Sequence, residues 1–198
     1  ATRCGELGIP VLLLNRETDD GTASCVASDN FGGGRMVAEH FINTGCKKIA
    51  YIAGDENSST NRDREAGLLS GLKEHGLKLH ARAVANYNHD QATKAANTMI
   101  AADDRPDAIF VANDYMAFAV IDVIRDKFGL RVPEDIAVVG YDDVPEASWA
   151  PYQLTTVRQS SEAMTDNAVM LLTEQIDGKR VEPQTIRLPA ELIIRTSA

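Results

Sequence analysis

Polar side chains that could bind a small molecule follow several short apolar runs of the sequence. Asn15 and Arg16 come directly after VLLL, Asn113 comes after IFVA, and Asp142 comes after VVGY. Arg64 closes NSSTNRDR, the polar stretch that follows the run YIAG. Arginine offers a fork of donors, asparagine offers a donor and an acceptor, and aspartate offers only acceptors. This combination suits a neutral polyhydroxyl ligand, whose hydroxyl groups both donate and accept.

Helix capping is the alternative role of such residues, because Asp and Asn are common where a strand gives way to a helix. We expect Asp114 to cap the helix that follows it rather than to contact a ligand. For any single position, capping or solvation is the more common role. A ligand-binding role is supported by the residues as a set, because they recur at the same end of successive units, where ligands of open parallel sheets bind.

Motifs of common catalytic centres do not occur in the sequence. Gly67–Gly71 reads GLLSG rather than GxSxG, and neither a Walker lysine loop nor GxGxxG is found. The triplet Gly32–Gly34 falls at a helix start and is expected to relieve crowding there. The adjacent Asp142 and Asp143 could hold Mg²⁺, but neighbouring side chains diverge and no phosphate loop accompanies them. The histidines lack metal-ligand spacing. We therefore expect no enzyme, no metal ion and no cofactor.

Short apolar runs alternate with helical patterns along the chain. Buried strands are expected at 9–14, 25–27, 49–53, 108–112 and 136–141. Helices are expected around 36–41, 92–100, 114–128 and 164–172, each with apolar residues at a period of 3.6. This alternation predicts βαβ units and therefore an α/β fold with doubly wound parallel sheets. The tail differs, since 184–188 and 191–195 are strand-like with no helix between them.

Length and composition fit one large domain or two small lobes of an ordinary globular protein. The chain has 198 residues, 44% hydrophobic and 25% charged, and a net charge of −9. Such an acidic chain would repel a phosphate backbone, so these residues are not expected to grip nucleic acid themselves. Three cysteines in no disulfide or zinc pattern favour the reducing cytoplasm. No apolar run is long enough to cross a membrane.

Several segments together resemble one family of regulators. In chain order they read GIPVLLLNR, ASDNFGGGRMVAEHF, GCKKIAYIAG, NRDREAGLLSGL, AIFVANDYMAFAVI, LRVPEDIAVVGYDDVPEA and PYQLTTVRQ. This order and spacing resemble the lactose and galactose repressor (LacI/GalR) family of transcriptional regulators over nearly the whole chain. The motifs VAND, VPEDIAVVGYDD and LTTVRQ are specific in combination, and the tail PQTIRLPAELIIRTSA is similar to that family's C-terminus.

The resemblance implies a fold like that of periplasmic sugar-binding proteins, with two α/β lobes, three crossovers and an effector in the cleft between them. The hinge would lie at Ser28 and Asp29. The resemblance assigns to the ligand site Asn15, Arg16, Arg64, Asn113, Asp142 and Gln159. Tyr87 and Asn88 stand where the family often has an aromatic that stacks on the ligand, and both are included among the ligand-binding candidates.

The resemblance also implies how the chain divides. Residues 29–159 and 179–198 would form the C-terminal lobe, and residues 1–28 and 160–178 would be the remnant of an incomplete N-terminal lobe. The helix-turn-helix that binds operator DNA in this family is expected to lie outside the chain. A homodimer that binds a sugar or sugar derivative, and uses lobe closure to change the DNA affinity of the full-length protein, is the leading hypothesis. The alternative is a periplasmic sugar-binding protein of a transport system.

Overall fold

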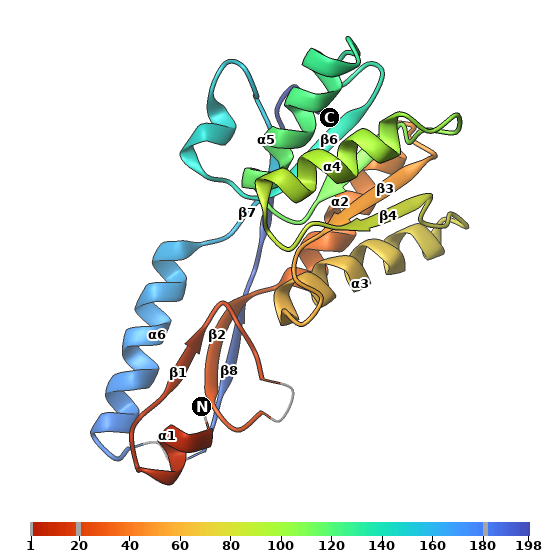
Figure 1. Ribbon diagram of the computed structural model, residues 1–198. Coiled ribbons are helices and arrows are strands. Elements are labelled where there is room, and N and C mark those ends of the chain that lie inside the picture. Colours follow the sequence, from red (N-terminus) through yellow and green to blue (C-terminus); the bar gives the residue numbers. More distant parts are fainter. Residues whose placement is uncertain (1, 19–20, 180–181) are drawn as a thin grey trace.

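The chain is organised around two β-sheets (Figure 1). The computed structural model describes residues 2–18, 21–179 and 182–198, and the strands of these residues form a six-stranded and a three-stranded sheet. Both sheets carry helices on their faces. The predicted α/β class with doubly wound parallel sheets is therefore confirmed.

The larger sheet has the strand order β4-β3-β5-β6-β7-β9, and all neighbours run parallel except β7 and β9. Its strands are β3 (Ile49–Ala53), β4 (Ala81–Val84), β5 (Ala108–Val111), β6 (Ala137–Asp142), β7 (Thr155–Arg158) and β9 (Glu191–Ile193). The chain steps from β3 outward to β4 and then back to β5. Because crossovers are right-handed, this reversal places the helices on opposite faces.

The helices of the larger sheet are α2 (Asn30–Asn43), α3 (Ser59–Glu74), α4 (His89–Ile100) and α5 (Asp114–Asp122). Helices α2 and α3 pack together on one face, whereas α4 and α5 lie on the other (Figure 1). A π-helical turn, η1 (Val123–Lys127), continues α5, so the helix expected over 114–128 is present but not α-helical throughout. It ends at Gly129 with φ +63°, as predicted.

Glycines allow α2 and α3 to approach closely. A Cβ on Gly34 would lie 2.1 Å from the Arg64 carbonyl oxygen, and one on Gly67 would lie 2.0 Å from that of Phe31. The glycines of the triplet 32–34 therefore relieve crowding, as the sequence suggested. The close approach places the α3 backbone against the start of α2 and so fixes the position from which the Arg64 side chain extends.

The interior of the larger sheet is continuously apolar. Every residue of β3 is fully buried, and so is nearly every residue of β5 and β6. Phe110 contacts both Tyr51 and Tyr141, with ring centroids 5.2 and 6.5 Å apart. Strands buried on both faces show such unbroken apolar runs, which is why they could be located from the sequence.

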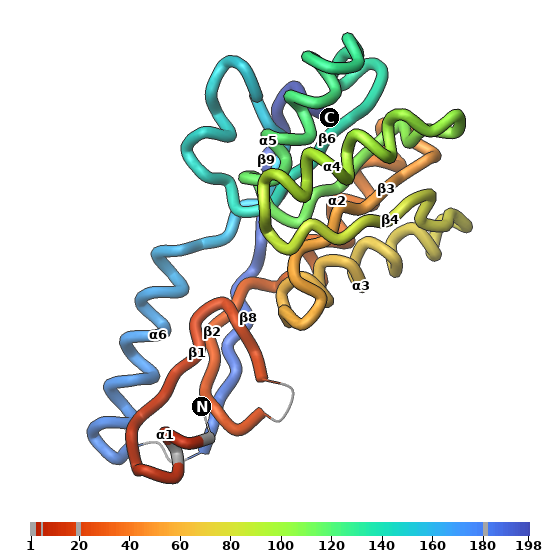
Figure 2. The backbone as a smooth tube through the Cα atoms, viewed as in Figure 1, coloured from red at the N-terminus to blue at the C-terminus, as the bar shows by residue number. Residues whose placement is uncertain are grey.

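The smaller sheet has the order β1-β2-β8 and is parallel throughout. Its strands are β1 (Leu12–Leu14), β2 (Ser24–Ser28) and β8 (Thr185–Leu188). Helix α6 (Ser161–Ile176) packs against them, and the short α1 (Thr2–Glu6) precedes β1. The chain passes between the two sheets after β2, after β7 and after β8 (Figure 2).

The position of β8 corrects the expected division of the chain. Residues 179–198 were expected to lie wholly in the larger lobe, but Thr185–Leu188 pairs with β2 in the smaller sheet. Ile186 and Leu188 face the same small apolar cluster as Val26 and Leu171, which explains the pairing. A strand pattern shows which residues are buried but not which sheet they join. The other boundaries of the division stay a prediction.

Candidate functional site

A polar pocket of about 170 Å³ lies at the carboxyl ends of the central strands of the larger sheet. It is at the point where the strand order reverses, the usual place for a ligand in an open α/β sheet. The pocket is lined by Asn15, Arg16, Thr60, Arg64, Tyr87, Asn113 and Asp142. Asn15 and Arg16 come from the loop after β1 of the smaller sheet, so the pocket lies between the two sheets.

Arg64 is a buried arginine on α3, with only 3% of the residue exposed. Its Nε donates to Asn30 Oδ1 at 2.9 Å and its Nη1 donates to the Ala112 carbonyl at 2.6 Å. Its guanidinium carbon lies 3.6 Å from the centroid of the Tyr141 ring. These contacts fix the side chain in the wall of the pocket, with Nη2 3.6 Å from Asp142 Oδ1.

Asp142 ends β6 and adopts φ +120°, a conformation that non-glycine residues seldom take. Its Oδ1 accepts from Gln159 Nε2 at 2.7 Å. Burial raises the pKa of the Asp142 carboxyl, while the nearby Arg64 charge and the Gln159 hydrogen bond oppose that shift. A ligand hydroxyl that donated to this carboxylate would replace part of its lost hydration.

The smaller sheet contributes a segment that docks on the start of α3. Arg16 Nη1 donates to Ser58 Oγ at 2.7 Å, and the backbone nitrogen of Glu17 donates to Ser59 Oγ at 3.0 Å. Asn15 adopts φ +53°, and its Oδ1 is buried with no hydrogen-bond partner among the described residues. A buried acceptor of this kind is costly unless something donates to it, so a ligand hydroxyl suits the position.

Tyr87 forms the aromatic part of the wall. Its ring lies over Gly54, where a Cβ would be 2.2 Å from the ring, and its hydroxyl is 3.4 Å from Thr60 Oγ1. Asn88 is not among the residues that line the pocket, and its side chain caps α4 by accepting from the Gln91 backbone nitrogen at 3.0 Å. Of the two candidates at this place, the structure brings only Tyr87 to the pocket.

The expected cap of α5 is wrong by one residue. Asn113, not Asp114, caps the helix, since its Oδ1 accepts from the Met116 backbone nitrogen at 3.1 Å. Asn113 still lines the pocket. Asp114 is fully buried and accepts from Thr156 Oγ1 at 2.6 Å and from the Val144 nitrogen at 3.0 Å. Burial raises the pKa of Asp114 to about 6 despite these two hydrogen bonds.

The remaining candidates lie behind the pocket or beside it. Gln159 is not in its lining, but it reaches the site through its hydrogen bond to Asp142. Ser28 ends β2, and Asp29 caps α2 by accepting from the Gly32 nitrogen at 2.8 Å. Both therefore stand where the chain passes between the sheets. Thr60 was missed, because a threonine in a polar loop carries no signal of its own in a single sequence.

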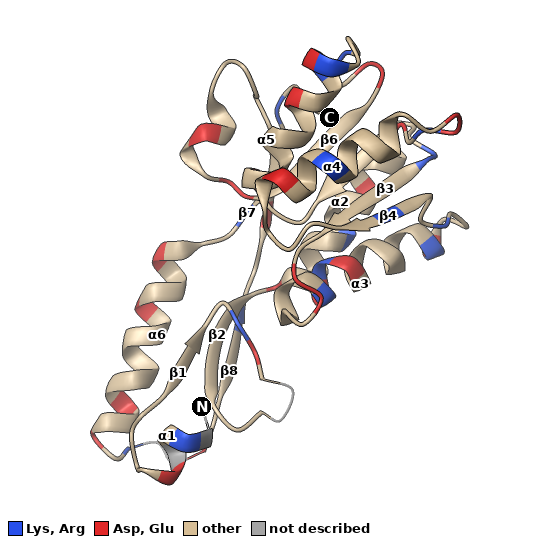
Figure 3. Cartoon of the chain, viewed as in Figure 1, with Lys and Arg blue, Asp and Glu red and all other residues tan. Residues whose placement is uncertain are grey.

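Other kinds of site find no support in the described part of the chain. Residues 2–18, 21–179 and 182–198 hold no group of three or more His, Cys, Asp or Glu that could bind a metal ion. No helix within those ranges is long and apolar enough to span a membrane. Acidic and basic residues are scattered over both sheets and their helices (Figure 3).

The seven residues lining the pocket offer amide, guanidinium, hydroxyl and carboxylate groups but no histidine or cysteine. Such a set can hold the hydroxyls and ring oxygen of a small polar molecule from several sides. A model of the periplasmic binding protein-like domain matches residues 38–198. The chain belongs to the periplasmic binding protein-like domain family. The match covers the whole larger sheet together with α6 and β8.

Similar members of this family are LacI-type transcriptional regulators, as the sequence resemblance implied. The chain is 30% identical over 191 residues to the HTH-type transcriptional repressor PurR of Mannheimia succiniciproducens, covering 96% of the chain and 57% of PurR. It thus spans little more than half the length of the curated relatives it matches. The relatives are transcriptional repressors such as PurR and a transcriptional regulator, CelR of Thermobifida fusca, which favours a regulator over a transport protein and over an enzyme.

Two solved structures show the same fold. The transcriptional regulator CelR in complex with cellobiose matches 98% of this chain and 61% of its own, with a TM-score of 0.92 and 33% identity. The lac repressor dimer bound to operator and the anti-inducer ONPF matches 96% of this chain and 56% of its own, with a TM-score of 0.87 and 29% identity. The fold of the periplasmic binding protein-like family therefore extends over both sheets of the chain.

Proposed function

We propose that this chain is the effector-binding part of a LacI-type transcriptional regulator, and that a sugar or sugar-like molecule binds in the pocket between its sheets. Arg64 carries this proposal. A guanidinium that is 3% exposed, held by Asn30 and Ala112 and facing Asp142 across 3.6 Å, is a costly arrangement for a fold that needs only packing. It is a preformed donor set for a polar ligand.

Closure of the two lobes is the proposed response to the ligand. Asn15 and Arg16 come from the smaller sheet, and Arg64 and Asp142 come from the larger one, so a ligand that contacts both sets favours the closed arrangement. A ligand can shift an equilibrium only by its differential affinity for the two states. The passages between the sheets, at Ser28–Asp29 and Gln159, would bend as the lobes move.

The partners of the full protein follow from the same proposal. Operator DNA would be bound by a helix-turn-helix in the part of such a regulator that this chain does not span, which suits the net charge of −9. A homodimer is proposed, and the exposed Tyr115 and Trp149 are apolar surface that a second copy could cover. The regulator would work in the cytoplasm without a cofactor.

A thermal-shift screen with calorimetry tests the proposal. The panel is cellobiose, D-glucose, D-galactose, D-ribose and D-glucuronate. A sugar at 100 times its Kd stabilises the native state by about 2.7 kcal/mol, which raises Tm of a chain of this length by roughly 5–10 °C.

Asp142→Asn should remove that shift, because it deletes the carboxylate charge facing Arg64 at almost constant shape. The matched control is Asp135→Asn, which changes an aspartate paired with Arg131 that does not line the pocket. A panel without any shift, or equal shifts for Asp142→Asn and the unchanged chain, would contradict the proposal.

A further inference from the structure

Two consecutive aspartates at the end of β6 point to different places. Asp142 lines the pocket, whereas the next residue, Asp143, does not. Both have positive φ, +120° for Asp142 and +55° for Asp143. Such backbone angles are uncommon outside glycine and need support from the surrounding structure. The side chain of Asp143 supports this turn, together with the hydrogen bond from the Val144 nitrogen to Asp114.

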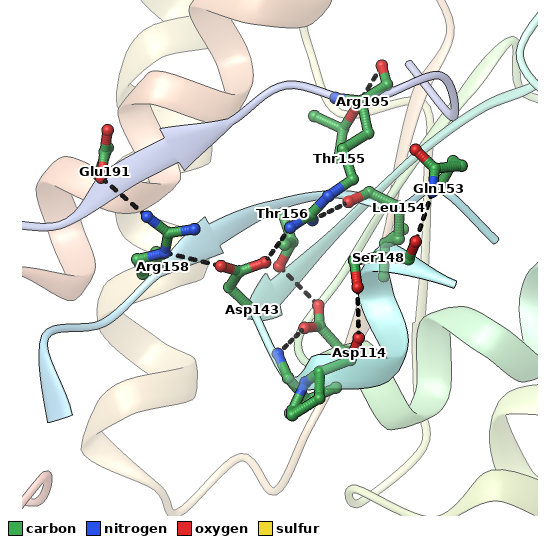
Figure 4. Close-up of polar contacts among 12 residues, drawn as sticks. Asp114, Asp143, Ser148, Gln153, Leu154, Thr155, Thr156, Arg158, Glu191 and Arg195 are labelled. Atoms are coloured by element: carbon green, nitrogen blue, oxygen red, sulfur yellow. Dashed lines mark hydrogen bonds and ion pairs between the residues drawn. The ribbon is translucent and has the colours of Figure 1, made fainter. Parts of the chain in front are cut away.

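Asp143 is held between two arginines (Figure 4). Its Oδ2 accepts from Arg158 Nε at 2.7 Å and its Oδ1 accepts from Arg195 Nη2 at 2.7 Å. The carboxylate side chain is 7% exposed, so these two guanidinium groups replace most of its hydration. Charge-assisted hydrogen bonds of this length are among the stronger polar contacts in proteins.

Arg158 borders a passage between the sheets, whereas Arg195 lies beyond β9 and beside the start of β7. Arg158 is the last residue of β7, and Gln159 and Ser160 lead from it into α6 beside the smaller sheet. Arg195 follows β9, which the chain reaches directly from β8 of the smaller sheet. Asp143 therefore joins the end of β6 to the passage after β7 through Arg158 and to the segment after β9 through Arg195.

The arginines differ in how firmly they are held. Arg195 is 15% exposed, donates Nη1 to the Leu154 carbonyl at 2.6 Å and donates its backbone nitrogen to Thr155 Oγ1 at 2.9 Å. Arg158 is 49% exposed, and its other ion-pair partner is Glu191 at 3.6 Å. Arg195 is thus the fixed anchor of Asp143, and Arg158 is the partner that can follow a movement of the passage.

We propose that Asp143 is a positioning residue for effector binding, which couples the carboxylate of Asp142 in the pocket to the passage after β7 through Arg158, while Arg195 anchors Asp143 within the larger sheet. The inference rests on the proposed function of the pocket. Arg158 and Gln159 are neighbours on one passage and hold neighbouring aspartates, since Gln159 donates to Asp142 at 2.7 Å. A rotation of that passage changes both contacts together, so the position of Asp142 depends on the arrangement of the lobes.

Hydrogen exchange of the unliganded full chain tests this coupling without any effector. Arg158→Gln removes the positive charge that pairs with Asp143, at a side chain that is 49% exposed. We expect amide exchange in 141–144 and 158–164 to quicken by about tenfold, because local openings respond to the contacts that close them. Exchange in Ile49–Ala53, on the far side of β5 from β6, should stay unchanged.

Arg131→Gln is the matched control, because it breaks an exposed pair with Asp135 away from the passages and should alter neither segment. Arg158→Lys keeps the charge and should restore most of the protection in 141–144. Equal exchange in Arg158→Gln and the unchanged chain would overturn the proposal. So would faster exchange throughout the larger sheet, which is the pattern of a merely structural role. A failed sugar screen would contradict the proposed function without affecting this outcome.

Discussion

The two sheets of this chain bury their apolar residues very differently. The larger sheet and its helices enclose one continuous core that includes Tyr51, Phe110 and Tyr141 at 0% exposure. Among the described residues, the cluster of the smaller sheet has just Val26, Met164 and Leu171 as buried members. On its helix α6, by contrast, Val169 and Ile176 are 61% and 66% exposed. Hydrophobic stabilisation scales with buried apolar area, so we expect the larger sheet to open less readily and to be the more rigid unit of the pair.

This contrast explains how the pocket is built. Arg64 belongs to the rigid side, where α2, β5 and β6 hold its guanidinium before any ligand arrives. Arg16 belongs to the other side, is exposed, and is held by one hydroxyl of Ser58. The preformed side, with Arg64, would orient the ligand, and the loosely held side, with Arg16, would move when the ligand binds. The next variants test this difference between the two sides.

Core truncation should produce the largest contrast. Phe110→Ala removes a fully buried ring that touches Tyr51 and Tyr141 and is expected to cost about 3–5 kcal/mol of unfolding free energy. Leu171→Ala in the smaller cluster should cost about 2 kcal/mol, because its thin surroundings can collapse into the space. Urea denaturation followed by circular dichroism measures both values.

The exposed Val169→Ala serves as the control for changes on α6 and should stay within about 0.5 kcal/mol of the unchanged chain. If Leu171→Ala cost as much as Phe110→Ala, the two sheets would be equally well packed and the comparison would fail.

A buried carboxyl on the rigid side gives the next largest effect, through pH. The pKa of Asp114 is raised to about 6 by burial, so between pH 4 and 6 the folded chain keeps a proton that the unfolded chain has lost. Stability from this group is therefore full below pH 4 and is lost as pH rises through 6. At roughly 1.4 kcal/mol per pKa unit, the loss is on the order of 3 kcal/mol.

Asp114→Asn should flatten that dependence, because its amide can accept from the Val144 nitrogen and donate to Thr156 without ionising. Thermal melts of both chains between pH 3.5 and 7.5 give the difference curve. The control is Asp135→Asn at an exposed ion pair. A difference curve without slope between pH 4 and 6 would show that Asp114 is ionised normally.

Features that depend on a local sequence pattern could be predicted from the sequence. Unbroken apolar runs marked β3, β5 and β6, and the polar residues after them, Asn113 and Asp142, reach the pocket. The cap of α5 was assigned to Asp114 because either residue of VAND has a suitable side chain, and only the three-dimensional contacts of Thr156 and Val144 separate them.

Long-range partners could not be read from the sequence. Thr60 lines the pocket because its position on α3 directs its side chain toward Tyr87. Strand β8 pairs with β2 because their apolar residues pack in one cluster, although the two strands are roughly 160 residues apart in the sequence. The two arginines that hold Asp143 come from β7 and from the segment after β9, which become neighbours only in the folded sheet. The periodicity of apolar residues indicates which side chains are buried, but not which distant segment of the chain covers them.

Arg16→Gln should have the smallest effect of the three comparisons and the most selective one. The side chain is exposed and bonded only to Ser58 among the described residues, so the unfolding free energy should change by less than about 0.5 kcal/mol. Calorimetry with the sugar that gives the largest thermal shift should show a loss of affinity of about 1 kcal/mol, or roughly fivefold, for one lost donor. Arg35→Gln, at an exposed pair with Glu74, should leave affinity unchanged. If Arg16→Gln lowered stability but not affinity, the docking of its segment on α3 would be structural, and the pocket would belong to the rigid side alone.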